Sequence, residues 1–239
     1  MIEPEPPTVT VVLPVHRQAD HIGAIVSGYH DALDDLGAAI ELLCVVNGSA
    51  DGSADACRAV AETRTGITVI ETGDRGWGNA VRRGIESSTG DLIAYTNSAR
   101  TSTKDLRTAL ALALLNRGSA VKAVRRARDN IFRRIGSVIF NLEARALFGL
   151  ASWDINGTPK VFPRSFDDLL RLEESGDLID LEFLVTCQQQ GYDLIEYPVT
   201  STTRHGGTST TGFASAFRMY AGAFALRRRV RGASRESRP

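Results

Sequence analysis

The chain has 239 residues, of which 43% are hydrophobic and 23% are charged, and its 28 basic side chains balance its 28 acidic ones. This composition is typical of a globular protein and excludes collagen, a coiled coil and wholesale disorder. The balanced charge gives no indication of a nucleic-acid partner, and the length favours one large domain.

The first half of the sequence alternates apolar strand patterns with helical ones. Thr8–Pro14 is β-branched and nearly all apolar, which predicts a buried parallel strand that ends at a proline. Residues 19–36 carry apolar side chains at helical spacing. Ile40–Val46 predicts a second buried strand, and Ser53 is of a type that caps the following helix. The remaining elements of this half are a strand at Ile67–Ile70, a helix that reaches Arg83 and a strand at Asp91–Tyr95.

The second half contains further helices and at least one more strand. In chain order these are a helix near 103–116, a short strand at 119–124, an arginine-rich stretch, a helix near 134–148, an acidic helix, the segment Gly191–Pro198, a glycine- and threonine-rich loop at Arg204–Gly212 and a helix at 213–228. We expect residues 7–229 to form a single domain. The ends, 1–6 and 230–239, are expected to be loose.

Strands that alternate with helices at this spacing predict an α/β fold, in which a mostly parallel sheet carries helices on both faces. Ligands of such sheets bind beyond the carboxyl ends of the strands. This rule places the loops at 14–18, 47–53 and 96–101 on one rim of the sheet and makes them the first candidates for a binding site.

The three cysteines, Cys44, Cys57 and Cys187, form neither a disulfide framework nor a zinc motif, which fits a reducing, cytosolic setting. The proline-rich, acidic N-terminus is unlike a signal peptide. The longest apolar run, Ala109–Leu115, is far too short to span a membrane. We therefore expect a cytoplasmic protein whose membrane contact, at the inner face, would be peripheral. The arginine-rich tail at 227–231 could supply such contact through attraction to anionic lipid.

A series of short blocks gives the sequence a family resemblance. The blocks are Val11–His16, Val46–Ser53, Arg75–Gly84, Gly90–Thr96, Asp154–Lys160, Asp180–Glu182 and Arg204–Ser209. In this order, over roughly residues 8–212, they resemble the family 2 glycosyltransferases, particularly the dolichyl-phosphate-mannose-synthase-like branch. The resemblance implies a Rossmann-like glycosyltransferase A fold, with a nucleotide-binding half at 7–101 and an acceptor half at 102–229.

The activity implied by the resemblance is an inverting, hexosyltransferase-like transfer. The donor would be a nucleotide sugar built on UDP or GDP, and the acceptor a polyprenyl phosphate or a small molecule. The sequence does not indicate the oligomeric state.

The chain departs from the family where acidic residues are usual. Val46 and Asn47 stand at the end of the second strand, Gln18 stands where a glutamate is common, and the Asp-x-Asp motif falls on Asn97-Ser98-Ala99. Magnesium and manganese prefer carboxylate and phosphate oxygens. We therefore expect no required metal and weak or no use of the usual metal site, with magnesium or manganese as the alternative.

Fixed cations can take over part of the work of a metal ion at a diphosphate. The resemblance makes Asp154, Lys160, Arg204 and His205 the catalytic candidates. The nucleotide-binding candidates are Pro14, Val15, His16, Asn47, Asp51, Gly76, Gly78, Asn79, Asn97 and Ser98. Those for an acceptor phosphate are Lys122, Arg125 and Arg133.

Several of these residues have a structural interpretation as well. Asp51 beside Gly52 is also typical of an Asx turn. The arginine cluster is also typical of a solvated basic face. Asp154, Asp180 and Glu182 could each act as a general base, yet a phosphate acceptor needs none. For Glu182 we favour an ion pair or a helix cap, whereas for Asp154 we favour a role in the site.

Two other functions compete with transfer. The first is a catalytically silent relative that binds a nucleotide, a sugar or a partner subunit, and the altered Asp-x-Asp motif favours it. The second, a nucleotidyltransferase, would need acidic metal ligands and a glycine-rich phosphate loop near the first strand. The segment at 14–18 provides neither, so we set this function aside.

Overall fold

The computed structural model describes residues 6–48, 50–125, 131–199 and 222–229, and for residues 131–139 it describes the backbone alone. The elements are β1 (Thr8–Val15), α1 (Ile22–Leu33), β2 (Ala39–Asn47), α2 (Ser53–Ala61), β3 (Ile67–Thr72), α3 (Trp77–Ser87), β4 (Leu92–Tyr95), α4 (Thr103–Leu115), β5 (Ala120–Arg125), α5 (Ile131–Phe148), β6 (Lys160–Pro163), the 3₁₀ helix η1 (Asp167–Arg171), α6 (Ile179–Gln190) and β7 (Leu194–Val199). Residues 222–229 form a further helix.

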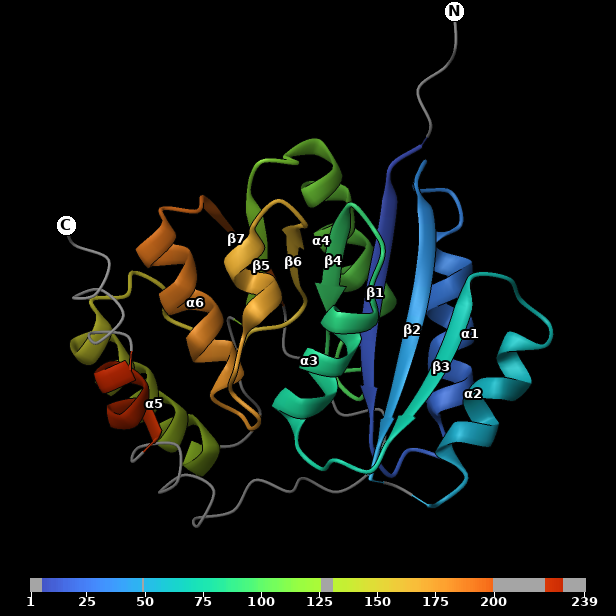
Figure 1. Ribbon diagram of the computed structural model, residues 1–239, viewed down its shortest axis with the longest axis horizontal. Helices are drawn as coiled ribbons and strands as arrows, with labels where there is room; N and C mark the ends of the chain where they lie inside the picture. Colours follow the sequence, from blue (N-terminus) through green and yellow to red (C-terminus); the bar gives the residue numbers. More distant parts are fainter. Residues whose placement is uncertain (1–5, 49, 126–130, 200–221, 230–239) are drawn as a thin grey trace, which may run out of the picture.

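The strands form one seven-stranded sheet in the order β3-β2-β1-β4-β6-β5-β7. All strand pairs are parallel except the two that involve β6, which is antiparallel to β4 and β5. The predicted α/β class, with its mostly parallel sheet, is therefore confirmed. The carboxyl ends of the six parallel strands and the start of β6 share one edge of the sheet, the lower edge in Figure 1. We call it the carboxyl edge.

Two apolar cores flank the sheet because side chains along each strand alternate between its faces. Val11 and Leu13 pack with α1, α2 and α4 on one face, whereas Val12 packs with α3, α5 and α6 on the other. Figure 1 shows these two helical layers on either side of the strands. All three β1 side chains are fully buried, as expected for a central strand covered on both faces.

Three details differ from the sequence-based expectations. Ser53 is the first residue of α2 and not its cap, because Gly52 occupies that position with a left-handed φ of 86°. The acidic helix is two elements, η1 and α6, and β6 was not expected as a strand. Part of the helix expected at 213–228 lies outside the described residues, as do the tail at 230–239 and residues 1–5.

Candidate functional site

Hydrogen bonds join three loops at the carboxyl edge. The His16 Nδ1 atom lies 2.8 Å from the Asn47 carbonyl oxygen, and the Asn47 side-chain amide donates to the Gly76 carbonyl oxygen at 2.9 Å. Since a carbonyl only accepts, the His16 ring carries a proton on Nδ1, and its neutral form presents Nε2 as an acceptor. The loops after β1, β2 and β3 therefore form one connected surface, which we call the rim.

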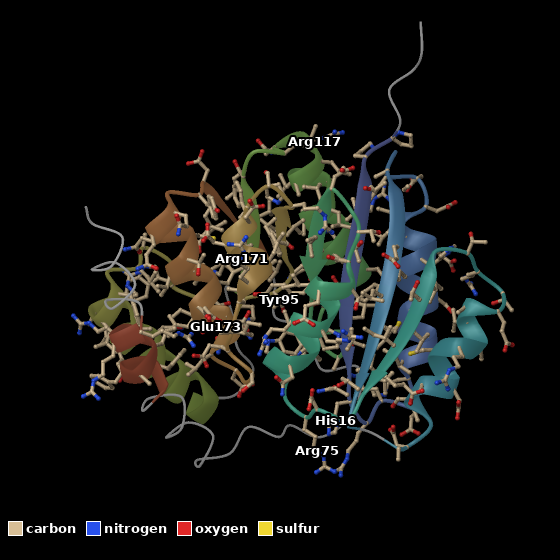
Figure 2. All side chains as sticks on the ribbon, in the orientation of Figure 1. His16, Arg75, Tyr95, Arg117, Arg171 and Glu173 are labelled. Carbon is tan, nitrogen blue, oxygen red and sulfur yellow. The ribbon has the colours of Figure 1, made fainter. Side chains whose placement is uncertain are left out.

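Arg75 is a cation on the rim that the sequence-based candidates omitted, although it begins one of the family-like blocks. Its side chain lies over Gly48, where an added Cβ would stand 2.5 Å from Arg75 Cγ. Figure 2 shows Arg75 and His16 next to one another at the carboxyl edge. Arg75 is exposed, and among the described residues its guanidinium makes no hydrogen bond or ion pair. Within the described part of the chain its positive charge is therefore not neutralised, and a guanidinium in this state can bind phosphate oxygens.

Asp51 forms the turn that enters α2. Its Oδ1 accepts from the Ser53 backbone N–H at 3.3 Å and from the Ser53 hydroxyl at 2.7 Å, and its Oδ2 accepts from the Ala19 N–H at 3.3 Å. Ser53 Oγ in turn accepts from the Gln18 N–H at 2.9 Å. This is the geometry of the Asx turn, and it also joins the loop after β2 to the loop after β1.

Asn97, Ser98 and Ala99 occupy the position of the family's metal motif. Asn97 Oδ1 accepts from the Ala99 N–H at 3.1 Å, while the buried Ser98 hydroxyl donates to Gln18 Oε1 at 3.0 Å. Ala99 is also buried and has no side-chain oxygen. Within the described part of the chain, no group of three or more His, Cys, Asp or Glu side chains could hold a metal ion. Because hard cations prefer carboxylates, these residues do not fit magnesium or manganese.

The glycines at the N-terminus of α3 allow another loop to pack closely. An added Cβ at Gly76 would stand 2.7 Å from the Ser175 carbonyl oxygen, and one at Gly78 would stand 2.5 Å from the Ser175 carbonyl carbon. The Asn79 N–H donates to the same Ser175 oxygen at 3.0 Å, and the Asn79 side chain donates to the Arg75 carbonyl. The N-terminus of α3 is therefore covered by residues 173–176, which we call the acidic loop.

A row of polar side chains crosses the sheet near the carboxyl edge. Tyr95, Lys160, Lys122 and Glu196 are successive register partners on β4, β6, β5 and β7. Lys122 donates to Ser152 Oγ at 2.9 Å and to Glu196 Oε1 at 3.0 Å. Burial lowers the pKa of Lys122. A side chain that is 0% exposed needs these partners because unpaired buried charges are very costly.

Lys160 is also 0% exposed and forms an ion pair with Asp180 of α6. The Tyr95 hydroxyl donates to the same Asp180 oxygen at 3.1 Å. Burial lowers the pKa of Lys160 to about 8, despite the opposing charge of Asp180. In this conformation the candidate cation is therefore enclosed between the sheet and α6 and neutralised by a carboxylate.

Asp154 and Arg125 form the third charged pair of this region. Asp154 accepts from the Arg125 backbone N–H at 2.9 Å and from its guanidinium at 2.8 and 2.6 Å. This clamp joins the end of β5 to the loop before β6. Arg133 lies in the part of α5 whose backbone alone is described, and Arg204 and His205 lie outside the described residues.

Of the remaining nucleotide candidates, Pro14 and Val15 are buried at the end of β1, and Asn47 is 4% exposed. His16 and Asn97 are partly exposed at the carboxyl edge. The candidates of the first half therefore lie in the rim loops, at the start of α3 and in the loop after β4, where Ser98 bonds to the loop after β1. The structure groups Lys122, Arg125, Asp154 and Lys160 separately, beneath α6 and the loop before β6.

Comparison with solved structures assigns this sheet to a class of protein, the glycosyltransferases of the A fold. A crystal structure of glucosyl-3-phosphoglycerate synthase from Mycobacterium tuberculosis, in complex with Mn²⁺, UDP and phosphoglyceric acid, matches with a TM-score of 0.72 at 18% identity. The match covers 92% of this chain and 78% of that one. A second crystal structure, described as a mycobacterial protein, gives a TM-score of 0.70 at 22% identity and covers 92% and 74%. These likenesses confirm the expected fold.

Residues 10–167 match the model of glycosyl transferase family 2, and the chain belongs to this family. Undecaprenyl-phosphate 4-deoxy-4-formamido-L-arabinose transferase from Salmonella typhimurium (strain LT2) is 25% identical over 209 residues. The match covers 86% of this chain and 63% of that protein, and the same holds for the Salmonella paratyphi B relative. The chain thus spans less than two thirds of the length of these relatives. Among the described helices, none has the length and hydropathy needed to cross a membrane.

Proposed function

We propose that the chain transfers a sugar from a nucleotide-sugar donor to a polyprenyl phosphate, with a small-molecule acceptor as the alternative. Membership of glycosyl transferase family 2 supports the reaction class, and the similarity to undecaprenyl-phosphate sugar transferases supports the acceptor. One observation carries the donor assignment. The rim joins His16, Asn47 and Gly76 at the carboxyl edge, and beside them it presents the guanidinium of Arg75, which no described carboxylate neutralises.

Transfer with inversion is a single displacement at the anomeric carbon of the sugar. An acceptor oxygen forms the new bond from one side while the bond to the donor phosphate breaks on the other. The leaving nucleoside diphosphate keeps the electron pair. A phosphate acceptor is already an anion, so no side chain must remove a proton from it. The protein then has to hold both reactants in line and stabilise the departing diphosphate.

Arginine suits the second task because its fork bonds two phosphate oxygens at once. We assign this role to Arg75 together with Arg204 and His205. Asn47, Asp51 and His16 are assigned to the nucleoside. Because Asn97-Ser98-Ala99 does not fit a divalent ion, the assignment uses fixed cations and no step that depends on a metal.

The acceptor half, at 102–229, contributes its own charged groups. Arg125 and Lys122 are the charged residues of β5, and they form ion pairs with Asp154 and Glu196, respectively. We assign them, with Arg133, to the acceptor phosphate. Lys160 lies in the same region. Because it is paired with Asp180 of α6, we assign it an indirect role, in which it helps to position α6. An acceptor carried by a lipid would bring the chain to the inner face of a membrane as a peripheral protein.

The proposal is tested by incubating the protein with UDP- and GDP-sugars and with undecaprenyl phosphate or water-soluble acceptors. Release of nucleoside diphosphate is measured with EDTA and, separately, with added manganese. Sugar transfer that persists in EDTA is the expected result. Transfer that requires manganese would contradict the role of fixed cations, and release without acceptor-dependent product would contradict the transferase assignment.

A catalytically silent binding module is the second candidate, and the altered metal motif favours it. The same experiment separates the two candidates. A silent relative would bind UDP or GDP in an equilibrium titration and give no turnover with any donor and acceptor. Turnover above that of a heat-denatured sample excludes the silent candidate.

A further inference from the structure

Arg229, on the helix at 222–229, contacts three carboxylates. It lies 3.0 Å from Glu173 Oε2, 3.1 Å from Glu174 Oε1 and 2.8 Å from Glu182 Oε1. Two of these partners belong to the acidic loop at 173–176, and the third belongs to α6. An arginine fork is suited to such multiple contacts in a way that a lysine is not.

Glu182 is the centre of this cluster. Its side chain is 10% exposed, and its Oε2 accepts from the backbone N–H groups of Glu173 and Glu174 at 3.0 and 2.8 Å. Burial raises the pKa of Glu182, and the two backbone donors and Arg229 oppose that effect. One carboxylate thus fixes the backbone of the acidic loop with one oxygen and holds Arg229 with the other.

The helix at 222–229 is also held by packing. Ala223 and Leu226 are buried in the same core as Leu178, and an added Cβ at Gly222 would collide with the Leu178 side chain. The ion-pair cluster and the apolar contact therefore fix this helix against the start of α6 at two points.

Hydrogen bonds connect the acidic loop to α3 and, through the start of α3, to the rim. In the acidic loop the Ser175 carbonyl accepts from the Asn79 N–H at 3.0 Å, and the Glu173 carbonyl accepts from Arg82 at 3.0 Å. The next contact is between Asn47 and the Gly76 carbonyl, and Asn47 in turn contacts His16. In Figure 2, Glu173 lies beside α6, and Arg75 and His16 lie below it and to its right.

We infer that Arg229 is a positioning residue for the donor site, acting through Glu182, the acidic loop and the N-terminus of α3. The inference rests on the proposed function for its effect on donor binding. It assigns a role to a residue at the far end of the chain from the rim, and it links the acceptor half to the nucleotide-binding half. Without this clamp, the N-terminus of α3 loses its fixed cover, and Gly76 and Asn47 lose their fixed geometry.

Hydrogen–deuterium exchange of the intact protein without nucleotide tests the structural link. Arg229→Ala and Glu182→Gln are compared with the wild type and with Arg228→Ala, an exposed arginine on the same helix. Both test variants should speed exchange within 173–176 and 76–80, with wild-type rates in β1 and β2. Wild-type rates at 76–80 in both variants, or equally faster exchange throughout the chain, would overturn the positioning role.

Titration with UDP and with GDP tests the consequence for the donor. Coupling of this kind changes affinity by about three- to tenfold. We expect Arg229→Ala and Glu182→Gln to lose affinity for the nucleotide by this factor. Arg229→Lys should lose less, and Arg228→Ala should keep the wild-type affinity. In turnover assays the donor KM should rise while kcat changes little. If the wild type binds neither nucleotide, the proposed function fails and the exchange rates at 76–80 still decide the inference.

Discussion

Replacing Gly78 with alanine should destabilise the protein because the acidic loop leaves no room for a side chain. The new Cβ would stand 2.5 Å from the Ser175 carbonyl carbon and 2.7 Å from the Gly176 carbonyl oxygen. Both are backbone atoms, so they cannot rotate away as a flexible side chain could. Overpacking of this kind costs about 1–3 kcal/mol. With several backbone atoms in contact, we expect the upper part of that range.

Alanine also favours a helix over glycine by up to about 1 kcal/mol, and Gly78 lies in the first turn of α3. The net loss in the free energy of unfolding should therefore be about 2 kcal/mol. Gly118→Ala is the matched control, since a Cβ there meets no atom within 4 Å. It should stay within about 0.5 kcal/mol of the wild type.

Urea unfolding followed by circular dichroism measures both variants, and equal slopes of the transitions allow the midpoints to be compared. If Gly78→Ala unfolds at the same urea concentration as Gly118→Ala, close packing does not explain this glycine. A role in the site would then be the remaining explanation for a glycine in the first turn of α3.

Three further predictions concern charges. Arg75→Ala should weaken binding of UDP or GDP by about 1.5 kcal/mol in an equilibrium titration, the low end for a charge-assisted contact because the side chain is exposed. The control variant Arg117→Ala, at the opposite edge of the sheet in Figure 2, should leave the affinity unchanged. Equal effects of the two substitutions would remove Arg75 from the site. Asp180→Asn should lower the free energy of unfolding, measured in urea, by about 3 kcal/mol because it leaves Lys160 buried without a counter-charge. The double variant Lys160→Met/Asp180→Leu should lower it by less. The reverse order would refute the ion-pair explanation. The pKa of Lys160 is about 8 in the folded protein and 10.5 in the unfolded chain. Between pH 8 and 10.5 the unfolded chain therefore keeps a proton that the folded protein has lost. The free energy of unfolding of the wild type, relative to that double variant, should therefore rise from pH 8 to about 10.5, and a flat difference would contradict the lowered pKa.

Local patterns in the sequence were sufficient to predict the first half of the fold. Thr8–Pro14 and Ile40–Val46 are nearly continuous apolar runs, and such runs are typical of a strand covered on both faces. The rule that ligands bind beyond the carboxyl ends of parallel strands then predicted a rim, and His16 and Asn47 do lie together there. Family membership and the glycosyltransferase A fold were also accessible, because the blocks that carry the resemblance keep their order along the chain.

Other features could not be read from neighbouring residues. β6 was missed because four residues, Lys160–Pro163, give little periodicity, and its antiparallel place between β4 and β5 is a property of the topology. Ser53 is a common capping residue, yet its hydroxyl is engaged by Asp51 and Gln18, and Gly52 takes the cap position. Glycines in the block at 75–84 resemble a nucleotide loop, and only the folded chain shows that Gly76 and Gly78 also allow the acidic loop to pack closely.

The same distinction separates the charges of the two halves. The sequence identified Lys160, Asp154 and Glu182 as candidate functional residues, because they stand in blocks that resemble those of the family. Only the folded chain determines that Lys160 faces Asp180 beneath α6 and that Glu182 faces Arg229, since these partners come from separate elements. Burial and pairing depend on which elements pack together, and they decide whether a cation is free to meet a phosphate or is already neutralised.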